Sequence, residues 1–128
     1  MKVLDSDLVI ASLRGRTDAN EKVKHLEQTG TLALASLTEY EVMLGAYFGK
    51  EDTIAKTEDF ISRYTVLPLD ANSAKRAAKI RAELMKQGSD LADIDVLIAA
   101  ITLEYDATLV TRNKAHFERI DKLGIEEW

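Results

Sequence analysis

The chain has 128 residues, no cysteine, 46% hydrophobic residues and a formal net charge of −5 at pH 7, so we expect a single domain over residues 1–128. The absence of cysteine excludes disulfides and thiolate metal sites, and two histidines leave oxygen as the main ligand for any metal, which favours magnesium, manganese or calcium. No apolar stretch has the length of a membrane span or the form of a secretion signal, so we expect a cytoplasmic protein that contacts no membrane.

The first expected element is a short buried strand at residues 2–5, which ends on an aspartate. Asp5 is followed two residues later by Asp7, and an apolar run then begins a first helix. A pair of carboxylates at the end of a strand can hold a metal ion, attack a phosphate group or cap the helix. Two basic residues, Arg14 and Arg16, come after this helix.

The rest of the chain combines long helical patterns with short apolar runs. These runs do not alternate cleanly with polar residues, which is typical of parallel strands covered on both faces. The elements expected after the first helix are helices at 19–30, 37–49, 71–88 and 93–105, strands at 31–36, 65–70 and 108–113, and a short edge strand at 124–128. This order predicts the α/β class, as a three-layer α/β/α sandwich with a central, mainly parallel sheet.

Two of the expected helices, at 37–49 and 93–105, are apolar around most of their circumference, so we predict that both are largely buried. Each of them carries a carboxylate: Glu41 lies in the first helix, and Asp95 lies near the start of the second. A carboxylate beside buried surface is unfavourable unless it is paired, hydrogen-bonded or bound to a metal.

Helix capping is the structural alternative for these acidic residues. Thr38 and Glu41 fit a capping box, and so do Ser36 and Glu39. Asp93 and Asp95 suit the first turn of a helix, where the helix dipole favours negative charge. Taken one at a time, these carboxylates are explained by capping as well as by function.

Four polar residues follow or flank the ends of predicted strands. Asp5 ends the first strand, Glu41 lies one turn into the helix after the second, Asn113 follows the fourth, and Asp95 opens the helix that leads into it. In an open parallel sheet, ligands bind beyond the carboxyl ends of the strands. Carboxylates gathered there would repel one another unless a divalent cation neutralised them. The combination therefore favours a metal site.

Four sequence segments have recognisable forms. "VLDSDLVI" (3–10) has D-[ST]-[ND]-hydrophobic, "SLTEYEVMLG" (36–45) has T-x-x-E-x-x-x-G, "DVLIAA" (95–100) has D-x-x-I-A-A, and "LVTRNKAHFERI" (109–120) has T-x-[ND]-x-x-x-F. With these forms in this order over almost the full chain, the sequence resembles the PIN-domain ribonucleases, and especially the VapC-like toxins of prokaryotic toxin–antitoxin pairs.

The resemblance implies that Asp5, Glu41 and Asp95 form an acidic metal-binding core. Asn113 would take a place often held by a fourth aspartate and is expected to contribute to catalysis. The residues expected to support these ligands from nearby are Thr111, Asp7, Asp93 and Thr38.

The implied activity is the hydrolysis of RNA phosphodiester bonds by an endoribonuclease that depends on Mg²⁺ or Mn²⁺, because a metal lowers the pKa of bound water and neutralises the phosphate. Arg112, Arg14 and Arg16 are expected nearest the site and are the preferred contacts to the RNA backbone. The implied partners are an RNA substrate, a cognate antitoxin and a second copy in a homodimer. The apolar surplus of 37–49 would supply both core and a partner surface.

Two other functions fit parts of the sequence. The stretch from Asp5 to Val9 matches D-x-D-x-[TV], the nucleophile loop of haloacid-dehalogenase-like phosphatases, in which Asp5 would attack phosphate. Such an enzyme would accumulate an aspartyl phosphate. A non-catalytic PIN-like module that binds RNA or a partner would instead bind neither Mg²⁺ nor Mn²⁺.

Overall fold

The computed structural model describes residues 1–128 and contains one sheet of five parallel strands in the order β3-β2-β1-β4-β5. The strands are β1 (Lys2–Leu4), β2 (Leu32–Ala35), β3 (Thr65–Leu67), β4 (Thr108–Thr111) and β5 (Gly124–Glu127). The predicted parallel sheet and its edge strand are therefore confirmed. The strands expected at 65–70 and 108–113 end earlier, at Leu67 and Thr111.

Helices fill most of the chain between the strands. They are α1 (Ser6–Leu13), α2 (Thr17–Thr29), α3 (Ser36–Tyr47), α4 (Glu51–Ser62), α5 (Ala71–Lys86), α6 (Asp93–Glu104) and α7 (Lys114–Phe117). Helices α4 and α7 were not predicted, because α4 is largely polar over its first two turns and α7 is a single turn. None of the helices combines the length and the apolar composition that crossing a bilayer requires.

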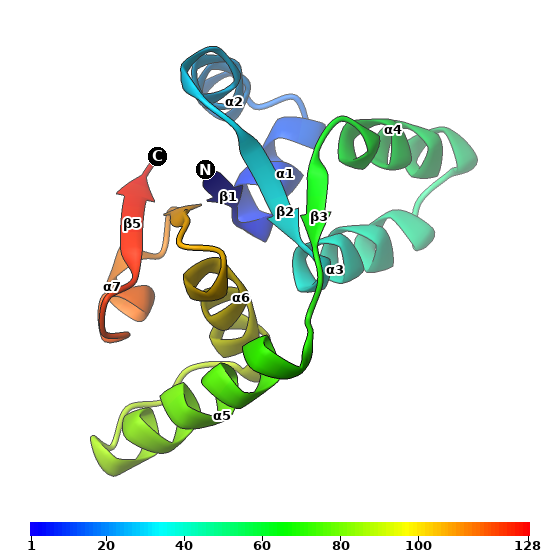
Figure 1. Ribbon diagram of the computed structural model, residues 1–128. Helices are drawn as coiled ribbons and strands as arrows, with labels where there is room; N and C mark the ends of the chain where they lie inside the picture. Colours follow the sequence, from blue (N-terminus) through cyan, green and yellow to red (C-terminus); the bar gives the residue numbers. More distant parts are fainter.

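Strand side chains alternate between two hydrophobic cores, one on each face of the sheet. Val3 and Leu109 pack into the core that includes α5, α6 and α7, whereas Leu4 and Val110 pack into the core that includes α1, α2 and α4. Figure 1 shows α5 and α6 on one side of the strands and α1, α2 and α4 on the other. The predicted three-layer α/β/α arrangement is confirmed, and burial on both faces explains why the strand sequences do not alternate.

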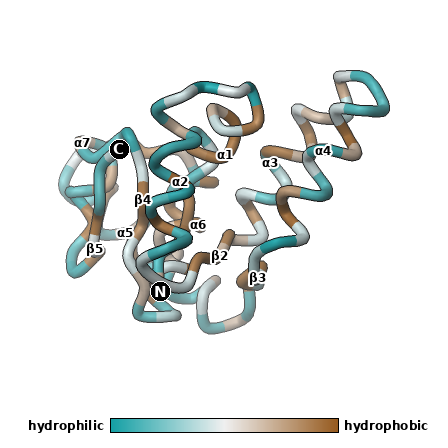
Figure 2. The backbone as a smooth tube through the Cα atoms, turned by 90° about the horizontal axis from the view of Figure 1, so that it is seen from above, coloured by the Kyte–Doolittle hydropathy of each residue, from teal (hydrophilic) through white to brown (hydrophobic).

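The two apolar helices have different environments. Helix α6 is buried as predicted, since every residue from Ile98 to Thr102 is inaccessible to solvent. The prediction that α3 is largely buried is wrong: only Thr38, Val42 and Ala46 are buried on it. Helices α3 and α4 form a hairpin that projects from the rest of the chain (Figure 2), so α3 packs along one side only.

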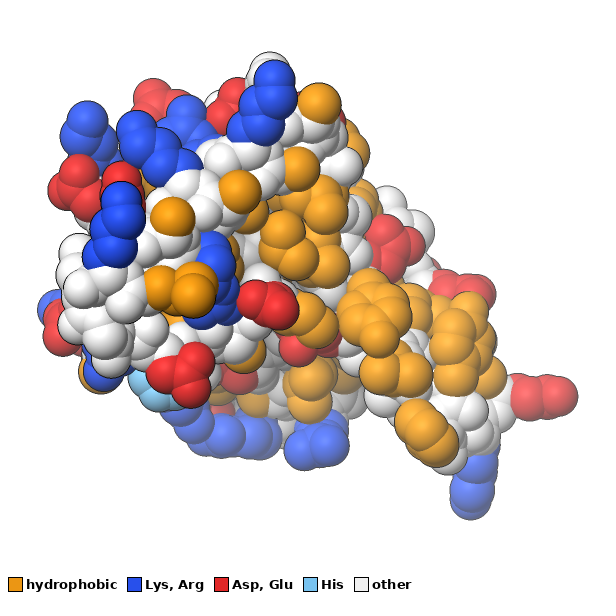
Figure 3. Space-filling view, turned by 90° about the horizontal axis from the view of Figure 1, so that it is seen from below, with side chains coloured by type: hydrophobic (Ala, Val, Ile, Leu, Met, Phe, Trp, Pro, Cys, Tyr) orange, Lys and Arg blue, Asp and Glu red, His pale blue; other side chains and the backbone are white.

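The outer side of α3 is apolar and exposed. Its exposed side chains are Tyr40, Leu44, Tyr47 and, at the helix end, Phe48, which is 87% exposed. Figure 3 shows hydrophobic side chains gathered on the projecting part of the molecule. Contiguous apolar surface of this kind marks an interaction site in a folded protein. The sequence prediction that this apolar surplus partly serves a partner surface is consistent with its exposure.

Asp70 is the N-cap of α5 and directly precedes its first residue, Ala71. Its Oδ1 accepts hydrogen bonds from the backbone N–H of Ser73 at 2.8 Å and from the Ser73 hydroxyl at 2.9 Å. We expect Asp70→Ala to lower the free energy of unfolding by about 1 kcal/mol, because these donors lose their partner. Urea denaturation at pH 7 would measure it. Asp70→Ser should retain most of the stability, and equal losses from both substitutions would contradict the capping role.

Candidate active site

The carboxyl ends of the parallel strands share one edge of the sheet, and two buried polar residues meet there. Asp5 directly follows β1 and is only 5% exposed, and Thr111 ends the neighbouring strand β4 and is fully buried. The Thr111 hydroxyl donates to Oδ2 of Asp5 at 2.7 Å, and the Ser6 backbone N–H donates to Oδ1 at 2.9 Å. Asp5 is thus also the N-cap of α1, and both of its oxygens are held in place.

Glu41 reaches the same edge from α3. Its Oε1 accepts a hydrogen bond from the hydroxyl of Ser6 at 2.5 Å, so the residue after Asp5 orients it. The capping-box interpretation of Thr38 and Glu41 is wrong, because α3 begins at Ser36 and Glu41 bonds to α1 rather than back to the backbone of Thr38. The segment 36–39 is not a capping box either, since α3 has no side-chain hydrogen bond at its N-cap.

Asp7 and Asp95 add two more carboxylates to this edge. The backbone N–H of Arg112 donates to Oδ2 of Asp7 at 3.3 Å, while Oδ1 of Asp7 is buried without a partner. Asp95 lies in the first turn of α6 and is half-buried. The first-turn position predicted for Asp95 is confirmed, and the residue also faces the other acids.

The electrostatics show that these carboxylates act on one another. The pKa of Asp5 is raised to about 7, mainly by burial and in smaller part by the charges of Asp7 and Asp95, against the lowering effect of the hydrogen bond from Thr111. Burial also raises the pKa of Asp95, the negative charges of Glu41 and Asp7 add to the rise, and His116 opposes it. The structure therefore brings Asp5, Asp7, Glu41 and Asp95 into one electrostatic group.

This group fits a divalent cation by its chemistry. All of its candidate metal ligands are carboxylate oxygens, which Mg²⁺ and Mn²⁺ prefer. The mutual repulsion of these carboxylates is relieved when a cation binds. Oδ1 of Asp7, which has no hydrogen-bond partner, is a further candidate ligand. No three His, Asp or Glu side chains stand as a ready-made coordination shell, so the side chains would have to turn toward an ion.

Asn113 and Asp93, two other residues singled out by the sequence, lie at the margin of this group. Asn113 is exposed, and its backbone N–H donates to the Thr111 hydroxyl at 3.1 Å, so it helps to orient the Asp5–Thr111 pair through its main chain. Asp93 faces solvent and pairs with Arg81 at 2.7 Å. The structure does not bring Asp93 to the other acids. Thr38 is fully buried in α3 with its hydroxyl unpartnered.

Of the three arginines expected to contact RNA, two lie close to the carboxylate group and one lies away from it. Arg112 follows Thr111 and lies beside Asp7, and its Nη2 donates to Oδ2 of Asp18 at 3.1 Å. Arg16 binds the same carboxylate at 2.7 Å. Arg14 instead ends α1 and lines a cavity of about 230 Å³ between α1, α3 and α4, away from the helix end that Asp5 caps.

Neither Asp18 nor the Trp128 ring on which Arg112 stacks was predicted from the sequence. The Arg112 Cζ lies 3.7 Å from the Trp128 ring centroid. A correct pairing of the last two strands would have indicated this contact, because Thr111 is in register with Glu127.

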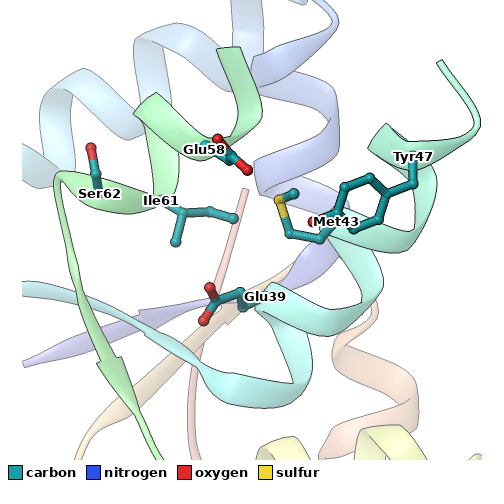
Figure 4. A pocket seen from close by; sticks show the side chains of 6 residues that line it. All are labelled: Glu39, Met43, Tyr47, Glu58, Ile61 and Ser62. Carbon is teal, nitrogen blue, oxygen red and sulfur yellow. The ribbon is translucent and has the colours of Figure 1, made fainter. Parts of the chain in front are cut away.

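A separate pocket of about 310 Å³ lies between α3 and α4 (Figure 4). It is lined by Glu39, Met43, Tyr47, Glu58, Ile61 and Ser62. Glu39 lies here rather than beside Glu41, because residues two apart on a helix point to different sides. The pocket shares no residue with the carboxylate group and adjoins the exposed apolar side of α3.

The chain is similar to known proteins over nearly its whole length. A family model described as the PIN domain matches residues 2–123. A tRNA(fMet)-specific endonuclease VapC of Shigella flexneri is 32% identical, covering 98% of this chain and 96% of that protein. Ribonuclease VapC2 of Haemophilus influenzae is 33% identical with the same coverage.

Solved structures of VapBC complexes contain chains with a similar fold. The DNA-bound VapBC of Salmonella typhimurium has a chain that is 30% identical, with a TM-score of 0.90, covering 99% of this chain and 97% of that one. The VapBC2 of Rickettsia felis, bound to a DNA fragment from its promoter, has a chain that is 25% identical with a TM-score of 0.90, covering 99% and 98% of the two chains. The similarity therefore extends over nearly the whole length of each of these relatives.

Proposed function

The chain belongs to the PIN domain family, and from this premise we propose that it is an endoribonuclease that acts as the toxin of a toxin–antitoxin pair. The observation that carries the proposal is the group of Asp5, Glu41 and Asp95, with Asp7, at the carboxyl edge of the sheet. Nearly full-length ribonuclease relatives support the reaction. The phosphatase alternative is not retained, since the PIN match covers residues 2–123.

Each residue of the site has a task in this reaction. Asp5, Glu41 and Asp95 would hold Mg²⁺ or Mn²⁺, with Asp7 and Asn113 beside them. A bound divalent cation supplies hydroxide at neutral pH and neutralises the phosphate oxygens. Thr111 and Ser6 keep the Asp5 and Glu41 carboxylates oriented by the hydrogen bonds that they donate. Arg112 and Arg16 would bind the RNA backbone, because guanidinium groups match phosphate geometry.

The partner surfaces follow from the exposed apolar side of α3. We assign this side, with the adjoining pocket between α3 and α4, to the antitoxin and to a second copy in a homodimer, because it is apolar, projecting and uncovered. The similarity to chains of VapBC complexes supports a protein partner. We also infer that residues 1–128 form a single domain and that the protein acts in the cytoplasm.

Metal-dependent RNA cleavage is the direct test. We expect the purified protein to cut RNA with Mg²⁺ or Mn²⁺, to lose activity in a chelator and to regain it when metal is restored, because the site has only carboxylate ligands. The tRNA(fMet) named for the Shigella relative is the first substrate to try, beside a second tRNA. Cleavage of equal rate in chelator would contradict the proposal, and failure to bind either metal would favour the non-catalytic module.

A further inference from the structure

Arg112 and Trp128 leave neighbouring strands at the same level. Thr111 of β4 is in register with Glu127 of β5, so the next residue of each chain segment lies at the carboxyl edge of the sheet, beside the acidic group. The guanidinium of Arg112 lies over the indole of Trp128, with Cζ 3.7 Å from the ring centroid. The backbone N–H of Arg112 meanwhile donates to Asp7.

Asp18 completes the arrangement from the start of α2. Its carboxylate accepts from Nη2 of Arg112 at 3.1 Å and from Nε and Nη2 of Arg16 at 3.2 and 2.7 Å. The Cζ of Arg16 also lies 5.7 Å from the Trp128 ring. Two guanidinium groups around one carboxylate leave a net positive charge directly beside the acidic group.

The indole and the guanidinium differ in their exposure. Trp128 packs against the core that contains α1 and α2, and its indole nitrogen is buried. The Arg112 side chain is 40% exposed, and only one of its N–H groups is used by Asp18. Arg112 is thus anchored by its face on Trp128 and by one N–H on Asp18, while its remaining N–H groups are free to bind a phosphate in pairs.

We propose that Trp128 and Asp18 are positioning residues that hold the Arg112 guanidinium as a binding site for an RNA backbone phosphate next to the one that is cleaved. This inference rests on the proposed function. An arginine that is already fixed loses less side-chain freedom when it binds, so its affinity for phosphate is higher. Stability does not account for the arrangement, because exposed ion pairs contribute little to it.

The test measures RNA binding by fluorescence anisotropy at several salt concentrations, with Ca²⁺ in place of Mg²⁺ and with the RNA checked on a gel to be intact after the measurement. We expect Trp128→Leu to weaken binding about three- to tenfold, the range of a partly exposed cation–π contact, and Trp128→Phe to stay near the parent. Arg112→Ala should weaken binding at least as much and lower the salt dependence by about one phosphate contact. The double variant should bind like Arg112→Ala alone, since Trp128 acts through Arg112.

Arg63 provides the matched control. It also stacks on an aromatic ring, with Cζ 4.7 Å from the Phe60 centroid, and lies within 3.7 Å of Glu27. It precedes β3 and so lies at the amino edge of the sheet. Arg63→Ala removes the same charge and the same kind of stack, and we expect it to bind RNA like the parent protein.

A second readout comes from Trp128 itself, which is the only tryptophan. RNA binding should change its emission in the parent and in Arg63→Ala, and much less in Arg112→Ala. If Trp128→Leu does not fold, Asp18→Asn and these emission changes decide the matter: Asp18→Asn should weaken binding about two- to threefold, within the range of an exposed ion pair.

If Trp128→Leu binds RNA like the parent, this inference is overturned and the proposed function is not. If the leucine variant does not fold, parent-like binding by Asp18→Asn has the same meaning. Additive losses in the double variant would do the same. A parent protein that binds no RNA would overturn the proposed function as well, so the two failures are distinguishable.

Discussion

Asp5→Asn is expected to lower the rate of RNA cleavage by at least about 100-fold, because the loss of a direct metal ligand should cost more than the roughly 10- to 100-fold loss typical of a residue that only supports a ligand. The substitution keeps the shape of the side chain but removes its charge and one of its acceptor oxygens. Asp5 is the buried member of the acidic group, and Thr111 and Ser6 hold it in place. Single-turnover cleavage with saturating Mg²⁺ measures the chemical step.

Asp95→Asn should show a loss of the same order, because Asp95 faces the same group from α6. Asp59→Asn is the matched control, since Asp59 is an exposed helical aspartate on α4, and it should cleave like the parent. Substantial residual activity in Asp5→Asn would show that the acidic group is not the catalytic site. These variants, purified in parallel, also exclude a contaminating nuclease.

The second large effect is a dependence of stability on pH and metal. The pKa of Asp5 is raised from 3.8 to about 7 in the folded protein, so the folded state binds a proton that the unfolded chain has released. The contribution of Asp5 to stability is therefore fully present below about pH 4, is lost as the pH rises toward 7 and stays lost above that. The shift corresponds to a loss of up to about 4 kcal/mol at pH 8 without metal.

Asp5→Asn removes this penalty because its side chain carries no charge. In chelator at pH 8, we expect the variant to melt several degrees above the parent, since about 1 kcal/mol shifts the Tm of a domain of this size by a few degrees. At pH 4 the difference in Tm between the two proteins should become smaller or change sign, because Asp5 is then protonated in the parent and keeps its hydrogen bond from Thr111. Thermal melts of both proteins across this pH range give the comparison.

Adding Mg²⁺ should reduce the difference in stability between the parent and Asp5→Asn at pH 8. A cation at about 100 times its dissociation constant stabilises the folded state by about 2.7 kcal/mol in total, which offsets most of the penalty of up to about 4 kcal/mol in the parent. The parent should gain more than Asp5→Asn, whereas Asp70→Ala should gain as much as the parent, because its cap lies outside the site. An equal gain in parent and Asp5→Asn would mean that Mg²⁺ does not bind at this carboxylate.

Several features of the protein are determined by local sequence. The short apolar runs predict the strands, because parallel strands covered on both faces need no polar side, and the structure has them at β1 to β4. The positions of Asp5 after β1 and of Thr111 at the end of β4 predict that both lie at the carboxyl edge of a parallel sheet, although their contact requires β4 to lie beside β1. Asp95 opens α6 and Asp70 caps α5 for reasons confined to one helical turn.

The tertiary structure alone decided the remaining features. The exposure of α3 could not be predicted from its composition, because an apolar helix is buried only where other elements cover it, and this one projects with α4. Glu41 fits a local cap in the sequence but bonds to Ser6 of another helix. Arg112, Asp18 and Trp128 come together only because the strand order places β5 beside β4 and α2 near their ends. Contacts between residues so distant in the chain depend on strand order and helix packing, which no local pattern specifies.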